Sequence, residues 1–483
     1  MTSGWRGAAL LFVAATSVFA ASPVVTNGDS FLVGPTAHSL LHERDLDIDE
    51  HLGPATDGGI AYVADPDGPD PGTLLGAELP RNLPSALDAY DYFPWVTAVL
   101  VTPLTATFDV AGAVGIDALD PDRMLARGET GALNLAGASL LTAGAVVAMA
   151  VLAWQALGAL EDRRRRLATL AVAVVTALGT PAWSTLSRAL WNQTVAVLFL
   201  SLAVLVAFRV SRGAASPRRL GLLLGATVAA AYTARPTSAV AVVAFGVWLL
   251  ARHRRALVGY LAGGVAVAVP WTAVNLATFG SVFPPYHSAE RAGLRDDTFE
   301  ALAANLVSPN RGLLVFTPIV VVSIVGAVFA LRERGPVTRP LAVTAVAIAL
   351  VHLVVVSAAG EAWWAGSAYG PRFMADLLPV LVLLALPAVE RLARPASADG
   401  WRRAALAAAI VSVVMHLPGA WSKPAQCWNL DPVPVDVDPS RVWHWDDLQA
   451  WRPMRVLLDT GSPQDAVFQR CDDLLQRRPG PEG

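Results

Sequence analysis

Residues 132–158, ALNLAGASLLTAGAVVAMAVLAWQALG, are followed by Arg163-Arg164-Arg165-Arg166 and then by a second apolar run, LATLAVAVVTALGTPAWS, residues 167–184. Each run is close to the ~20 apolar residues that carry a helix across a bilayer. Clusters of arginine in short loops mark the cytoplasmic side of a membrane protein. The stretch therefore predicts two membrane helices that are joined by a cytoplasmic loop.

The rest of the chain repeats this pattern. Of 483 residues, 54% are hydrophobic and 16% charged, with a mean hydropathy of +0.48, whereas soluble domains carry about 25% charged residues. Further arginine clusters lie at 209–219, 252–255, 332–339 and 391–403. The net charge of −3 gives no indication of nucleic-acid binding.

These features predict an all-α, polytopic protein of the cell (plasma) membrane, with about eleven transmembrane helices and extracytoplasmic juxtamembrane helices. The expected spans are 7–24, 132–158, 167–184, 190–208, 220–234, 237–251, 257–276, 312–331, 340–358, 373–390 and 404–420. This order places the N-terminus in the cytoplasm and the C-terminus outside. The run 92–108 contains two prolines and is interpreted as an interfacial or re-entrant helix. The N-terminus also resembles a signal peptide, and an uncleaved first span is the preferred interpretation.

A transmembrane domain, 1–420, is expected to carry outer loops at 25–131, 277–311 and 359–372. It is followed by an extracytoplasmic tail, 421–483. Both cysteines of the chain, Cys427 and Cys471, fall in that tail. Because the outer side of the membrane is oxidising, a disulfide between them is expected. Two free thiols are the alternative.

The loop from Glu361 to Arg372, EAWWAGSAYGPR, concentrates groups that recognise a phosphosugar. Aromatic rings stack on sugar rings, and a guanidinium binds phosphate through two parallel hydrogen bonds. Arg372 is therefore a candidate phosphate ligand, and the candidate sugar or acceptor ligands are Glu361, Trp363, Trp364 and Tyr369. The alternative is an aromatic belt at the membrane surface with a snorkelling arginine.

Other polar residues fall on the same predicted side. Asp29 directly follows the first span, where a carboxylate is costly unless it is solvated or partnered; a helix-capping aspartate is the alternative. Arg235 lies in a short outer turn and is either a second phosphate ligand or a snorkelling side chain. The further candidates for sugar or acceptor binding are Asp47, Asp49, Tyr286 and His287. The two aspartates could instead form a solvated edge, and His287 could be a surface residue.

The order of these features resembles the C-type (GT-C) multi-spanning glycosyltransferases, in particular the mannosyltransferase-like and aminoarabinose-transferase-like enzymes that use polyprenyl-phosphate sugars. The resemblance covers most of the chain up to about residue 420, and the order of the motifs is more specific than any one of them. Beside the residues above, its motifs are 90–95 (YDYFPW), 179–184 (GTPAWS), 234–236 (ARP), 308–312 (SPNRG) and 363–372 (WWAGSAYGPR). The common Asp-Lys-Pro-Pro-Gly element is replaced by 91–95 (DYFPW), and a long insert at about 53–88 precedes it.

The resemblance implies an inverting transfer of a sugar from a polyprenyl phosphate to a glycan, lipid or protein acceptor at the outer face. Asp29 would act as the general base, and Arg372 with Arg235 would stabilise the leaving lipid phosphate. A divalent metal is possible, although no ligand set stands out and no cofactor is certain. The alternatives are a multi-spanning transporter or lipid-linked-sugar flippase, for which broken helices at the bilayer midplane are typical, and a non-catalytic scaffold.

Overall fold

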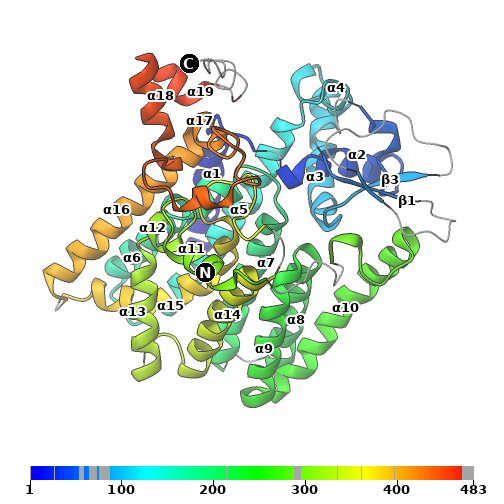
Figure 1. Ribbon diagram of the computed structural model, residues 1–483. Coiled ribbons are helices and arrows are strands. Elements are labelled where there is room, and N and C mark those ends of the chain that lie inside the picture. Colours follow the sequence, from blue (N-terminus) through cyan, green and yellow to red (C-terminus); the bar gives the residue numbers. More distant parts are fainter. Residues whose placement is uncertain are drawn as a thin grey trace.

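The computed structural model describes residues 2–26, 28–53, 59–64, 73–75, 87–213, 216–287, 295–333, 335–359, 362–395, 397–469 and 471. A bundle of helices makes up most of the molecule (Figure 1). Short helices and strands gather above one end of this bundle in that view. This end, which carries α2 (Val33–His42), the β strands and α17 (Lys423–Cys427), is called the loop end below.

Each of the eleven expected ranges contains a helix. Long apolar runs form these helices because a helix satisfies its own backbone hydrogen bonds in an apolar environment. In chain order they are α1 (Thr2–Ala20), α5 (Gly131–Ala156), α6 (Asp162–Leu178), α7 (Asn192–Ser211), α8 (Pro217–Ala234), α9 (Ala239–Arg252), α10 (Arg254–Phe279), α12 (Leu313–Phe316) with α13 (Val320–Arg332), α14 (Arg339–Ala358), α15 (Leu378–Ala393) and α16 (Asp399–Trp421).

Within the described part of the chain, seven helices are long and apolar enough to cross a membrane. They are α5, α7, α10, α14, α16, the segment Arg372–Ala393 and α3 (Val96–Ala113). This supports a helical membrane protein, while the number of eleven spans stays a prediction. The interfacial position expected for 92–108 also stays a prediction; the helix there contains Pro103.

Helices α8 and α10 pack with their backbones in near contact. A Cβ added at Gly225 would lie 1.9 Å from the Tyr260 carbonyl oxygen, and one added at Gly263 would lie 2.0 Å from that of Leu222. Gly221 on α8 and Gly259 on α10 complete two glycine pairs, each with a spacing of four, that face each other across this interface. Glycine is required here because small residues at this spacing let two membrane helices approach closely.

The segment after α1 forms a compact layer at the loop end. Helix α2 packs on α3 through Val33, Ala37, Ala98 and Val101. The layer also contains η2 (Asp49–His51), α4 (Pro121–Arg127) and a small antiparallel sheet in the order β2-β1-β3, with β1 (Ala61–Ala64), β2 (Thr73–Leu75) and β3 (Asp88–Asp91). The sequence analysis expected helices here and did not predict the sheet.

The tail folds back on the loop end through α17, α18 (Arg452–Thr460) and α19 (Pro463–Phe468). Cys427 and Cys471 are paired, with their Cα atoms 5.2 Å apart, so the expected disulfide is confirmed. Trp428 and the tail valines pack against Trp363, Trp364 and α11 (Thr298–Val307). The tail is therefore part of the packed structure at this end of the bundle.

Candidate functional site

Asp29 and Arg372 form an ion pair at the loop end. Asp29 lies in η1 (Gly28–Ser30), the first turn after α1, and Arg372 begins η8 (Arg372–Leu377) at the top of α15. The arginine side chain is 7% exposed and the aspartate side chain 25%. The pair therefore lies at the edge of the protein interior, where a small polar ligand could still reach it.

The guanidinium of Arg372 is held by further contacts. Its Nε donates to Gln193 Oε1 at 2.7 Å, and Gln193 Nε2 donates to the Arg372 carbonyl at 3.2 Å. The guanidinium carbon lies 3.7 Å from the ring centre of Trp191. Among the described residues, Nη1 has no hydrogen-bond partner. A rigid, stacked guanidinium with a free donor is well suited to bind a phosphate oxygen.

Arg235 lies in a buried network beside this pair. Its Nε donates to Asp376 Oδ2 at 2.6 Å, and Thr237 Oγ1 donates to the same oxygen at 3.3 Å. The Arg235 guanidinium also lies 5.2 Å from the ring centre of Phe373, which neighbours Arg372 in the chain. The structure thus brings both predicted phosphate ligands to η8, with Arg235 partly neutralised by Asp376.

Asp91 is a buried carboxylate at the end of β3. Its Oδ1 accepts a hydrogen bond from the Phe93 backbone N–H at 2.9 Å. Burial raises the pKa of Asp91 well above its ordinary value, and the charge of Asp29 raises it further. The shift favours the neutral form of the Asp91 side chain over the charged form. The sequence analysis noted Asp91 within its motif but did not predict it as a site residue.

Aromatic side chains from the segments 25–131 and 277–311 contact each other near Asp91. Tyr286 contacts Tyr92 and Phe93, with ring centres 5.7 and 5.4 Å apart. His287 Nε2 lies 3.0 Å from the Tyr232 carbonyl oxygen. Burial lowers the pKa of His287 to about 4, so the ring is neutral at pH 7 and Nε2 donates to that carbonyl. His287 Nδ1 is then a buried acceptor, and it has no hydrogen-bond partner among the described residues.

Asp47 and Asp49 lie along β3, on the segment that follows α2. Asp49 Oδ1 accepts a hydrogen bond from the Ala89 backbone N–H at 2.7 Å, and Asp47 forms a backbone bridge with Tyr90. Burial, followed by the charges of Asp45, Glu50, Asp49 and Asp88, raises the pKa of Asp47 to about 6. Asp49 therefore has a structural contact of its own, whereas Asp47 is an acidic group with an unusually high pKa.

Trp363, Trp364 and Tyr369 are packed against other parts of the protein and are each at most 9% exposed. The Trp363 and Trp364 indole N–H groups donate to Asp297 and Asp436, and the Tyr369 hydroxyl donates to the Met415 carbonyl. The structure thus places these three rings in contact with the tail and α16 and does not bring them to the Asp29–Arg372 pair. A sugar-binding role for them stays a prediction, and Glu361 lies outside the described residues.

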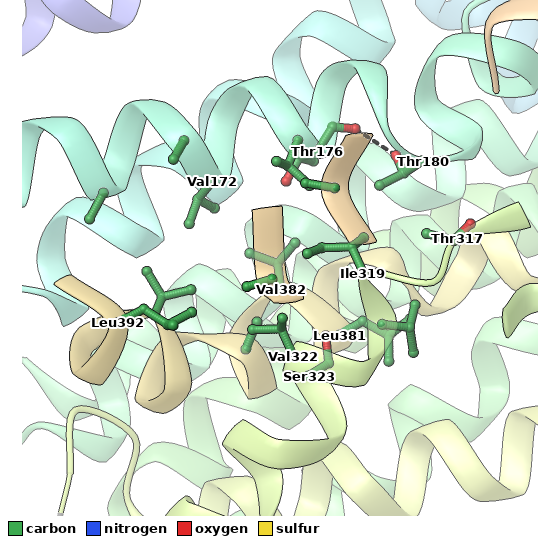
Figure 2. A pocket seen from close by; sticks show the side chains of 18 of the residues that line it. Val172, Thr176, Thr180, Thr317, Ile319, Val322, Ser323, Leu381, Val382 and Leu392 are labelled. Atoms are coloured by element: carbon green, nitrogen blue, oxygen red, sulfur yellow. Dashed lines mark hydrogen bonds between the residues drawn. The ribbon is translucent and has the colours of Figure 1, made fainter. Parts of the chain in front are cut away.

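A long apolar cavity of about 510 Å³ opens between α6, α13, α15 and α16 (Figure 2). The side chains that face it include Val172, Val322, Leu381 and Val382, and hydroxyl groups such as Thr180 line it as well. Met374, on the same turn η8 as Arg372, is also part of its lining. The cavity therefore reaches the turn that carries the arginine.

Arg188 is a fully buried cation that the sequence analysis missed. Its Nη1 donates to the Val24 carbonyl at 3.2 Å and its Nη2 to the Phe19 carbonyl, while its own carbonyl accepts from the Thr26 N–H at 3.0 Å. These bonds fix the chain between α1 and Asp29. Its signal in the sequence is an arginine in a short turn that is predicted to lie outside, as for Arg235.

Comparison with known proteins finds no family model, no characterised relative and no solved structure that matches the chain. The argument about function therefore rests on the geometry of the loop end. The residues that carry it are Asp29, Asp91, Gln193, Arg235 and Arg372.

Proposed function

We propose that this protein is a membrane glycosyltransferase that moves a sugar from a polyprenyl-phosphate donor to an acceptor at the outer face of the membrane. The contact between Asp29 and Arg372 carries the proposal. It sets a candidate general base against a candidate phosphate ligand at one end of an apolar helical bundle. An inverting glycosyl transfer needs this combination, because one step removes a proton and releases a phosphate.

In the proposed reaction the acceptor hydroxyl oxygen attacks the anomeric carbon of the sugar while Asp29 takes its proton. The bond between that carbon and the phosphate oxygen breaks, and its electron pair stays on the lipid phosphate. Arg372 stabilises the developing charge through charge-assisted hydrogen bonds, with Arg235 beside it.

The ion pair implies an order of events. Donor phosphate competes with Asp29 for the Arg372 guanidinium, and its arrival frees the carboxylate to act on the acceptor. Gln193 and Trp191 keep the guanidinium in place during this exchange because their contacts do not depend on Asp29. The apolar cavity beside Met374 would hold part of the polyprenyl chain.

The proposed topology follows from the arginine clusters and places the N-terminus in the cytoplasm and the tail outside. The loop end then faces the compartment where cysteines oxidise, in agreement with the bridge between Cys427 and Cys471.

The test is donor turnover by the purified full-length protein in lipid nanodiscs. Polyprenyl-phosphate mannose, glucose and arabinose are supplied separately with extracted cell-envelope glycans as acceptor. Release of free polyprenyl phosphate with a matching glycosylated product is expected for one donor. Movement of an intact lipid-linked sugar across vesicles, without release of lipid phosphate, would contradict the proposal and indicate a transporter.

A further inference from the structure

A cluster of histidines and carboxylates lies on α2, away from the Asp29–Arg372 pair. His38 and His42 are four residues apart and therefore project from the same face of the helix. Asp109, near the end of α3, faces them: His42 Nε2 lies 3.1 Å from Asp109 Oδ2. One ligand atom from each of His38, His42 and Asp109 lies within 4.8 Å of the other two.

The three ligand atoms are close to the spacing that a metal ion requires. Nitrogen and oxygen ligands about 2.1 Å from a tetrahedral zinc ion lie roughly 3.4 Å from one another. The separation between His42 and Asp109 is already in that range, and the rings of His38 and His42 have their centres 4.3 Å apart. Small side-chain rotations are sufficient to close the rest of the gap.

His38 supplies a second, independent observation. The residue is 8% exposed, and neither of its ring nitrogens has a well-aligned hydrogen bond among the described residues, although Nε2 lies 3.0 Å from Asp122 Oδ1 on α4. Buried polar groups are normally hydrogen-bonded, so the His38 Nδ1 atom, which has no neighbour of this kind among the described residues, points to a missing partner. A metal ion would supply that partner.

The surroundings resemble those of a metal centre. The His51 ring lies 4.9 Å from the His38 ring, and its Nε2 lies 3.0 Å from Glu50 Oε1. Ser39 Oγ in turn donates to Glu50. Asp122, 3.0 Å from His38 Nε2, is placed as the outer-shell carboxylates that orient ligand imidazoles in metal sites are. The side chain of His42 is 46% exposed and that of Asp109 is 28% exposed, which leaves a path for an ion to enter.

We propose that His38, His42 and Asp109 bind a zinc ion. The donor set of two imidazoles and one carboxylate fits zinc and disfavours magnesium and calcium, which prefer oxygen ligands. The ion would join α2 to α3. Helix α2 follows the turn that carries Asp29, and α3 follows Asp91, so the ion would fix the two segments that carry these carboxylates. The proposal does not depend on glycosyl transfer.

The test uses full-length protein in detergent, stripped with a chelator and titrated with zinc ions alone. Metal content is measured by mass spectrometry after desalting, and thermal stability is followed in parallel. We expect one zinc ion per chain and a rise in Tm on binding. Substitution of an outer-shell residue typically lowers metal affinity by ~10–100-fold. His42→Ala and Asp109→Asn remove ligands themselves and should lower zinc affinity by at least as much.

Both substituted side chains are partly exposed, so these variants should fold. The matched control is His444→Ala, on the exposed surface of the tail, which should bind zinc as the wild type does. Failure of the wild-type protein to retain zinc would overturn the proposal. Equal zinc affinity in His42→Ala, Asp109→Asn and the wild type would overturn it as well. A magnesium titration of the same stripped protein should produce no change in Tm.

Discussion

Asp29 and Arg372 are 343 positions apart in the chain, yet they form an ion pair between the first turn after α1 and the first turn of η8. Two segments, 188–193 and α15, support this pair. Arg188 fixes the chain that leads to Asp29, Gln193 and Trp191 hold the arginine, and α15 continues directly from η8. The pair is thus a fixed point at which the proposed base and the proposed phosphate ligand meet.

Substitution of Arg372 by lysine tests its role as the phosphate ligand. Lysine keeps the charge but loses the planar guanidinium, which donates to both Gln193 and Asp29 and stacks on Trp191. We expect donor binding to weaken by roughly 10-fold or more, which corresponds to about 1.4 kcal/mol. Equilibrium binding of a labelled polyprenyl-phosphate sugar measures the effect. Arg127→Lys, a substitution of an exposed arginine on α4, should leave it unchanged.

Substitution of Gln449 by alanine tests the docking of the tail. Gln449 Oε1 accepts from Arg311 Nη1 at 2.8 Å and from the Gly370 N–H at 3.0 Å, and Nε2 donates to the Ala368 carbonyl. Each buried group left unpaired costs about 1–3 kcal/mol. Gln449→Ala should therefore lower Tm and speed proteolysis of the tail. A wild-type proteolysis rate would show that the tail is held by other contacts.

The helices were more predictable than the site. Apolar runs and arginine clusters identified all eleven helical ranges, because length and hydrophobicity are local properties of the sequence. Asp29 could be proposed because a carboxylate directly after an expected span is costly unless it is solvated or partnered, and the two arginines because a guanidinium binds phosphate. Gln193 and Asp376 could not, since each lies beside an apolar run without a recognisable motif and its role depends on which helices become neighbours.

The aromatic loop, 361–372, was noticed in the sequence, but its surroundings in the fold could not be predicted. Its composition predicted a sugar site, and the structure places Trp363 and Trp364 in a packed cluster with the tail. The sequence pattern predicts that these rings lie outside the apolar core of the membrane. It does not predict which other part of the protein packs against them. The small sheet was missed for a related reason: β1 and β2 are only four and three residues long and pair across stretches rich in glycine, aspartate and proline.

The close contact of α8 and α10 can be tested with two glycines. Gly225→Ala would place a Cβ 1.9 Å from a backbone oxygen, whereas Gly264→Ala, on α10, meets no atom within 4 Å. The first substitution should lower the free energy of unfolding by at least about 1–3 kcal/mol, which is the usual cost of an overpacked core. It should also reduce the yield of monodisperse protein. The second should have no such effect. Size-exclusion chromatography of the two variants decides this, and equal profiles would contradict the packing.

The raised pKa of Asp47 predicts a pH-dependent effect on stability. Because burial and neighbouring carboxylates raise this pKa from 3.8 to about 6, the folded state binds the proton more tightly than the unfolded state. Ionisation of Asp47 therefore destabilises the fold progressively as the pH rises from about 4 through 6. Asp47→Asn should raise Tm at pH 7.5 and have little effect at pH 4. A Tm difference that is the same at both pH values would contradict this assignment.

The most direct test of the central claim is turnover of Asp29→Asn with a matched lipid-phosphate sugar, measured beside donor affinity. Asparagine keeps the shape of the side chain but cannot accept the proton, so transfer should fall by about 10²–10⁴-fold. Donor affinity should not weaken, because the competitor of the phosphate at Arg372 loses its charge. Asp459→Asn, on the exposed face of α18, should behave as the wild type. Near-normal turnover in Asp29→Asn would contradict the account.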